Sequence, residues 1–115
     1  MKKRVVIFGD SNTWGYDAAT GGRFNEEIRW PMVAANLLGS EYRILEEGLC
    51  GRTTCLDDPF NEGLSGLTYL LPCLQTHSPL DMLVIMLGTN DCKQRFSLTA
   101  ANIALGMRRL VKKAL

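Results

Sequence analysis

The stretch Val5-Val6-Ile7-Phe8-Gly9-Asp10-Ser11-Asn12 runs from four apolar residues straight into a polar turn. A continuous β-branched and aromatic run of this kind is typical of a strand buried on both faces of a sheet. The same order recurs where residues 42–45 precede 48–54, and where residues 82–87 precede 88–91. If the three runs are parallel strands, their polar loops emerge together at the carboxyl edge of one sheet, where open α/β sheets bind ligands.

Helical patterns alternate with the three expected strands, which we place at residues 4–8, 42–46 and 82–87. Residues 16–24 and 56–66 contain glycine and acidic residues and are expected to be loops. Alternation of strands and helices is typical of an α/β fold in which a parallel sheet is joined by right-handed crossovers.

Three helices are expected. The first begins near Trp30-Pro31 and stops at Gly39. The second covers about residues 67–75 and is interrupted by Pro72, and the third begins at Ser97, whose hydroxyl can cap it. The residues expected on the buried faces are Val33, Ala34, Leu37 and Leu38 in the first helix, Leu67, Leu70, Leu71 and Leu74 in the second, and Ile103, Met107, Leu110 and Ala114 in the third.

The composition is that of an ordinary globular domain. The 115 residues are 46% hydrophobic and 22% charged, and 13 basic residues against 12 acidic ones leave a net charge of +1. This balance predicts neither a nucleic-acid nor a membrane-surface partner. Only four apolar residues follow the basic residues 2–4, which is too few for a secretory signal, and no stretch approaches the roughly 20 of a membrane span. We therefore expect a cytoplasmic protein.

We expect neither a metal nor another cofactor. The four cysteines show no Cys-x-x-Cys pair and no histidine spacing suited to zinc, so they should be free thiols in a reducing compartment. Cys73 is expected in the core, and two others adjoin the polar loops, where they should be partly exposed. The cysteines are Cys50, Cys55, Cys73 and Cys92.

Three residues of the polar loops have the chemistry of acyl transfer. Ser11 lies in a strand-to-helix turn that would expose its hydroxyl, although a capping serine explains the turn equally well. Gly51 can present a backbone N–H with no side chain in the way, and the amide of Asn90 can stabilise an oxyanion. Taken singly, a left-handed turn explains Gly51 and a side-chain turn explains Asn90. Their expected convergence at one edge favours a catalytic site.

The three blocks resemble those of the SGNH (GDSL-type) hydrolase superfamily, and residues 29–30 and 79–81 look like its arylesterase/acyltransferase branch. The matching blocks are residues 9–15, 46–54 and 86–91. This resemblance implies a three-layer flavodoxin-like parallel sheet and makes Ser11 the nucleophile. It builds the oxyanion hole from the backbone N–H groups of Ser11 and Gly51 and the side chain of Asn90, with Asp10 supporting the nucleophile loop.

One block of the family has no counterpart. The family carries an Asp-x-x-His segment that supplies the acid and the general base, and we expect residues 1–115 to be the amino-terminal part of a single hydrolase domain that continues with it. His77, the only histidine, precedes residues 79–87. At about 3.3 Å per residue it should lie about 25 Å from the catalytic edge, too far to act as the base.

The leading hypothesis is a serine esterase or acyltransferase that hydrolyses short-chain, small-molecule carboxylic esters through an acyl-Ser11 intermediate. The alternatives are a carbohydrate acetylesterase and a noncatalytic binding or interaction domain. The chain alone should be inactive, and the uncharged strand at residues 82–87 could pair with a second copy to form a homo-oligomer.

Overall fold

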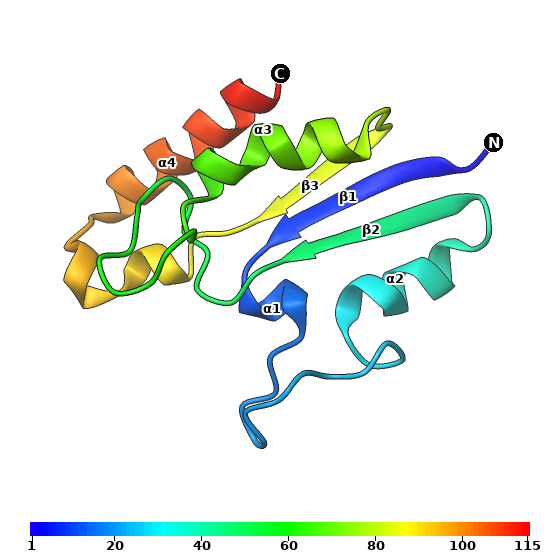
Figure 1. The fold of residues 1–115 in the computed structure, drawn as a ribbon, viewed down its shortest axis with the longest axis horizontal. Coiled ribbons are helices and arrows are strands. Elements are labelled where there is room, and N and C mark those ends of the chain that lie inside the picture. Colours follow the sequence, from blue (N-terminus) through cyan, green and yellow to red (C-terminus); the bar gives the residue numbers. More distant parts are fainter.

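The computed structural model describes residues 1–115 and has three parallel strands in the order β2-β1-β3 (Figure 1). The α/β class and the strand order are as the sequence predicts. Each strand is within about two residues of its predicted bounds. The elements in chain order are β1 (Lys3–Gly9), α1 (Ser11–Trp14), α2 (Trp30–Leu38), β2 (Tyr42–Gly48), α3 (Gly66–His77), β3 (Met82–Met86), the 3₁₀ turns η1 (Asn90–Cys92) and η2 (Gln94–Phe96), and α4 (Ala100–Ala114).

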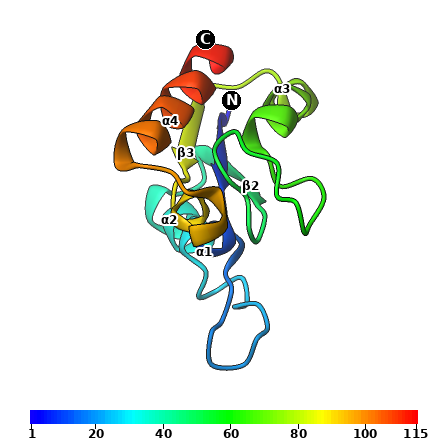
Figure 2. The ribbon, with the colours of Figure 1, turned by 90° about the vertical axis from the view of Figure 1, so that its left-hand side faces the viewer.

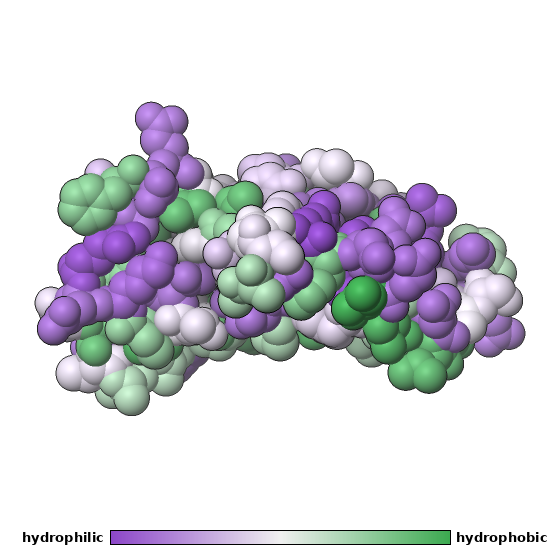
Figure 3. Space-filling model, turned by 90° about the horizontal axis from the view of Figure 1, so that it is seen from below, coloured by the Kyte–Doolittle hydropathy of each residue, from purple (hydrophilic) through white to green (hydrophobic).

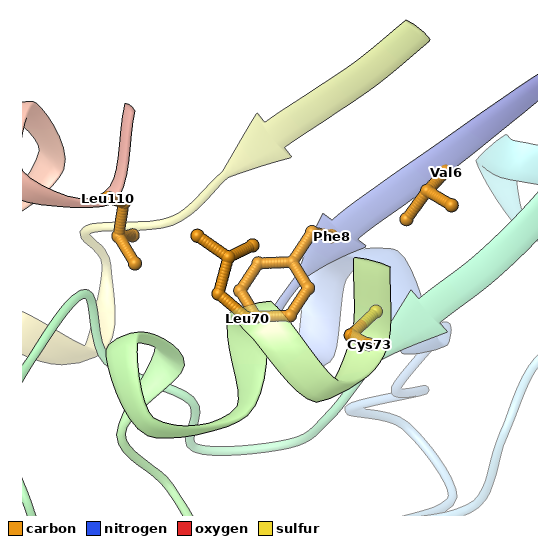
Figure 4. Packing of buried hydrophobic residues seen from close by; sticks show 5 residues of the cluster. All are labelled: Val6, Phe8, Leu70, Cys73 and Leu110. Carbon is orange, nitrogen blue, oxygen red and sulfur yellow. The ribbon is translucent and has the colours of Figure 1, made fainter. Parts of the chain in front are cut away.

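The sheet lies between two layers of helices. Helices α3 and α4 cover one face, and α1 and α2 lie on the opposite side (Figures 1 and 2). Strand β1 is the central strand, and residues 5–8 are at most 5% exposed, which confirms a strand buried on both faces. The side chains of Val6 and Phe8 point toward α3 and α4 (Figure 4). The fully buried cluster on that face consists of Val6, Phe8, Leu70, Cys73 and Leu110.

Helix α3 differs from the prediction because it continues through Pro72. Leu70 and Cys73 are both fully buried, so the helix is anchored on the sheet on either side of the proline. Pro72 is exposed, and water can therefore bind the carbonyl group that its missing N–H leaves free. Leu71, which we expected to be buried, is 39% exposed because it lies on the solvent side with Pro72.

The start of the last helix also differs from the prediction. Ser97 has a left-handed backbone and lies outside the helix. Thr99 is the N-cap instead, and its side chain accepts a hydrogen bond from the backbone N–H of Asn102 while the Asn102 side chain accepts one from the N–H of Thr99. This reciprocal capping box stabilises the first turn better than a single serine could.

Two apolar surfaces remain open. On α2, which begins and ends as predicted, Val33, Leu37 and Leu38 are 38%, 83% and 48% exposed, so the prediction that they face the core is wrong. Hydrophobic surface accordingly gathers over α2 in Figure 3. The second surface is a hollow of about 510 Å³ along β3, lined almost entirely by apolar residues of α3, β3 and α4 and the turn between α3 and β3. No helix has the length and apolar character needed to span a membrane.

Candidate active site

The first loop of the site carries Ser11 at the start of α1, directly after β1. Asp10 caps this short helix, since its carboxylate accepts a hydrogen bond of 3.0 Å from the N–H of Asn12. Thr13 is fully buried against Gly9, where a side chain would collide with it, so glycine is required at the end of β1. Ser11 itself is half-buried, and its hydroxyl makes no hydrogen bond within the chain, which leaves Oγ free to react.

The second loop follows β2 and carries Gly51. This residue has a φ of +87°, a left-handed conformation that disfavours any side chain, and a Cβ here would lie 2.9 Å from Leu64. The loop packs directly on the first one, because the N–H of Leu49 donates to the carbonyl of Gly9 at 3.2 Å. The backbone of the second loop is thereby held against the strand that leads to Ser11.

The third loop follows β3 and carries Asn90, which is 9% exposed. Its side-chain Nδ2 donates to the carbonyl oxygen of Arg52 at 3.1 Å. Asp91 is 1% exposed, and its carboxylate accepts from both the N–H and the hydroxyl of Thr54, at 2.9 and 2.6 Å. These bonds join the third loop to the second. As expected, the three loops meet at the carboxyl edge of the sheet.

Sequence reasoning placed Arg52, Thr54 and Asp91 in the loops of this edge but assigned them no role. All three are at most 3% exposed although they are charged or polar. The available signal for these residues was their position directly after predicted buried strands. The signal does not show which of them pair, because Asp91 and Thr54 are 37 positions apart in the sequence. Only the packing of β3 beside β1 brings them into contact.

A cleft of about 430 Å³ opens beside the second loop, between the end of β2 and the start of α3. Its wall includes Gly48, Leu49 and Arg52 from the loop and Thr68 and Tyr69 from α3. The cleft therefore lies next to Gly51, at the end of the sheet where the three loops meet. It is large enough for a small organic group.

The placement of His77 requires a correction. Its carbonyl oxygen accepts from Arg4, so its backbone lies at the amino end of the sheet as predicted. Its side chain, however, reaches back along the sheet, and Nε2 lies 2.6 Å from Oε2 of Glu47, the penultimate residue of β2. The estimate of about 25 Å is therefore wrong for the imidazole. The ring still contacts Glu47 on the α3 face, whereas Ser11 lies in α1 on the opposite side of the sheet.

Glu47 is the centre of a hydrogen-bonded network under α3. Tyr69 donates to its Oε1 at 3.1 Å, and His77 contacts its Oε2. Burial, followed by the nearby Glu47 carboxylate, raises the pKa of Tyr69 to about 12 and that of the Cys73 thiol also to about 12. Both groups therefore keep their protons and can donate to the carboxylate.

The same network corrects the prediction that no cysteine has a histidine partner at ligand spacing. Cys73 and His77 are four residues apart on α3, and with Glu47 they place one potential ligand atom each within 4.8 Å of the others. Two ligands of one tetrahedral zinc ion, bound at about 2 Å, lie roughly 3.3 Å apart. The 2.6 Å separation of His77 Nε2 and Glu47 Oε2 is that of a hydrogen bond, which fits a proton network better than an ion site.

The two cysteines beside the polar loops, Cys50 and Cys92, are exposed as expected, and all four cysteines are free. Burial raises the pKa of the Cys50 thiol above its ordinary value. A thiol with a raised pKa is a weaker nucleophile at neutral pH than a free one. Neither the Cys50 thiol nor the Ser11 hydroxyl is activated by a neighbouring base within residues 1–115.

A parallel sheet with polar loops gathered at one edge defines an α/β protein whose ligand site is expected at that edge, and the comparisons name the family. Residues 7–115 match the model of the GDSL-like Lipase/Acylhydrolase family, and the chain belongs to it. No curated protein matches the chain.

Several solved structures similar to the chain are esterases. The native aryl esterase of M. smegmatis is 50% identical with a TM-score of 0.91, over 96% of this chain and 53% of that one. Est24, a carbohydrate acetylesterase from Sinorhizobium meliloti, is 48% identical with a TM-score of 0.93, over 96% and 54%. The SGNH-hydrolase family esterase AlinE4 shares the fold at 20% identity, with a TM-score of 0.69. The chain thus spans about half the length of these proteins.

Proposed function

We propose that this chain is the amino-terminal part of a serine esterase that hydrolyses short-chain carboxylic esters through an acyl-Ser11 intermediate. The observation that carries the proposal is the joining of three loops at one sheet edge by hydrogen bonds, from Leu49 to Gly9 and from Asn90 to Arg52. Membership of an acylhydrolase family supports the reaction class. The half-buried Ser11 hydroxyl, which is free of hydrogen bonds, supports the choice of nucleophile.

In this mechanism Oγ of Ser11 attacks the ester carbonyl carbon while its proton passes to a general base. The carbonyl oxygen becomes an oxyanion, which accepts hydrogen bonds from the N–H groups of Ser11 and Gly51 and from the Asn90 amide. One N–H of that amide donates to Arg52, which leaves the second available for the oxyanion. The alcohol then leaves with a proton, and water or a second alcohol releases the acyl group.

The general base of the proposal lies in an Asp-x-x-His segment beyond Leu115. Two observations support a carboxyl-terminal half that completes the domain. The chain matches about half the length of the similar esterases. The hollow along β3 and the apolar face of α2 are the surfaces that further strands and helices would cover. In the absence of that half, we expect the edge of β3 to pair with a second copy.

The substrate class follows from what the neighbours share. One similar structure is an aryl esterase and another a carbohydrate acetylesterase, so the alcohol differs between them while the ester bond is common. We propose a small acyl group and a variable alcohol. Small aryl or alkyl esters are the leading substrates, and acetylated sugars are the second candidate.

The test uses the full-length protein that contains this chain. A phosphonate ester should label the enzyme once, and mass spectrometry of the peptides should place the adduct on Ser11. The variant Ser11→Ala should neither be labelled nor hydrolyse an aryl acetate. Labelling elsewhere, or activity that survives in Ser11→Ala, would refute the nucleophile assignment. A wild-type protein that is neither labelled nor active would favour the noncatalytic binding domain instead.

A further inference from the structure

Arg52 is the one residue that contacts all three loops of the edge. Its guanidinium Nη1 donates to the carbonyl of Gly9 at 3.1 Å, two residues before the proposed nucleophile. The same nitrogen donates to the carbonyl of Glu47 at 2.6 Å, at the end of β2. Its own carbonyl accepts from Asn90 Nδ2 at 3.1 Å. Arg52 also follows Gly51 directly, so its backbone nitrogen belongs to the same peptide unit as the Gly51 carbonyl.

The guanidinium is held rigidly. Arg52 is 3% exposed, and its Cζ lies 4.2 Å from the ring centre of Phe8 and 5.2 Å from that of Tyr69. Phe8 is fully buried in β1, and the two rings are stacked at 6.2 Å. Cation–π contacts of this kind stabilise a buried charge whose burial is otherwise costly. The planar group therefore has a fixed place between the strand and α3.

Burying an arginine costs free energy because its charged guanidinium is removed from water. Burial lowers the pKa of the Arg52 guanidinium, with Glu47 opposing that shift, and Nε has no hydrogen-bond partner in the protein. Well-packed apolar residues often stabilise a core as well as a buried charge does. The retained charge is explained by what it does to the loops, since its donors end on the backbone carbonyls of Gly9 and Glu47.

We propose that Arg52 is a positioning residue for ester hydrolysis, which fixes the Ser11 loop, the Gly51 N–H and the Asn90 amide relative to one another. The inference rests on the proposed function and extends it to a residue that does not touch the substrate. A shift of Arg52 would move Gly51, release the carbonyl of Gly9 and turn the Asn90 amide. Misplacement of catalytic groups by about 1 Å can cost about 10²-fold in rate.

Arg52 binds the carboxyl end of β1, and the chain offers a matched control, Arg4, at the amino end of that strand. The guanidinium of Arg4 also donates to backbone carbonyls, to Pro79 at 3.1 Å from Nε and to His77 at 3.0 Å from Nη2. Arg4 lies at the amino edge, away from the three loops. Replacing either arginine by lysine keeps the charge and removes the planar, two-sided donor group.

The experiment compares Arg52→Lys with Arg4→Lys in the full-length protein, using an aryl acetate and a phosphonate label. For Arg52→Lys we expect kcat to fall about 10- to 100-fold, KM to change less than about threefold, and phosphonate labelling to slow in parallel with kcat. Arg4→Lys should lower the unfolding temperature and leave kcat within about twofold. This split separates positioning from a loss of folded protein.

Arg52→Gln, which keeps two N–H donors without the charge, is the second variant if Arg52→Lys does not fold. The proposal is overturned if a folded variant retains wild-type kcat, if the whole loss appears in KM, or if both variants are recovered only unfolded, because Arg52 would then be a purely structural residue. Activity that persists in Ser11→Ala would instead refute the proposed function, whatever the Arg52 variants do.

Discussion

The two ends of β1 use the same interaction for different purposes. At the amino end, the half-buried Arg4 fastens the strand to the turn between α3 and β3 through the carbonyls of His77 and Pro79. At the carboxyl end, the 3% exposed Arg52 fastens one loop to the carbonyl of Gly9 and, through its own carbonyl, to Asn90. The first joins neighbouring elements of the fold, and the second sets distances between groups of a site.

The two ends are also connected. Arg4 binds the carbonyl of His77, the His77 ring contacts the Glu47 carboxylate, and the Glu47 carbonyl accepts from Arg52. This chain of contacts runs along the α3 face beside β1. Because Arg4 binds no loop of the site directly, we expect the amino end to affect mainly stability and the carboxyl end to affect the geometry of the site.

The largest expected effect comes from separating the three loops at the carboxyl end of the sheet from the general base proposed for the rest of the protein. The isolated 115 residues should hydrolyse an activated aryl acetate on the order of 10⁶-fold more slowly than the full-length protein, because a nucleophile without its base keeps only a small residual advantage over water. The measurement is kcat for both proteins, with Ser11→Ala of each as the background. Equal rates would place the base within these residues and make His77 the first candidate.

The second effect compares an asparagine side chain of the proposed oxyanion hole with an asparagine side chain that only stabilises a helix. In the full-length protein, Asn90→Ala should lower kcat about 10²- to 10³-fold, since one oxyanion donor is lost. Asn102→Ala is the matched control, because Asn102 belongs to the capping box of α4 and should cost about 1 kcal/mol of stability with kcat unchanged. Steady-state kinetics and urea unfolding of both variants test this, and a similar kcat for the two would remove Asn90 from the oxyanion hole.

The sequence predicted the parts of the molecule that follow from local patterns. The apolar runs predicted the three strands and the meeting of the loops that carry Ser11, Gly51 and Asn90. The block resemblance implied the catalytic roles of these residues, and those roles stay predictions. Errors arose where distant contacts decide. The buried contacts of Leu70 and Cys73 carry α3 through Pro72. The side chains of His77 and Glu47 extend toward each other, which brings the imidazole to the last residues of β2.

The same limit explains the unpredicted features of the site. The proposed role of Arg52 depends on contacts with Gly9, Glu47 and Asn90 and with the rings of Phe8 and Tyr69. These residues are far apart in the sequence, and no regular spacing indicates that they meet. The apolar face of α2 was predicted to be buried because its apolar residues recur at helical spacing. These residues do share one face of the helix, but no other helix or strand of residues 1–115 covers that face. Periodicity indicates which residues would be buried together, and the packing partner has to be found in space.

The smallest expected effect is on stability at alkaline pH, and it tests the buried groups that surround the Glu47 carboxylate. Cys73 and Tyr69 have folded-state pKa values of about 12, above the ordinary values of 9.0 and 10.0. Below pH 9 both groups are protonated whether the protein is folded or not, so their contribution is fully present. Between pH 9 and about 12 the unfolded chain releases protons that the folded chain keeps, and the free energy of unfolding must fall.

Urea unfolding of the full-length protein at pH 8 and pH 10.5 measures this fall. Cys73→Ala should flatten it, even though the variant starts from a lower stability because a fully buried side chain is lost. Cys92→Ala is the control, because Cys92 is exposed and its removal should leave the slope unchanged. An unchanged slope in Cys73→Ala would mean that the thiol is not held protonated beside Glu47.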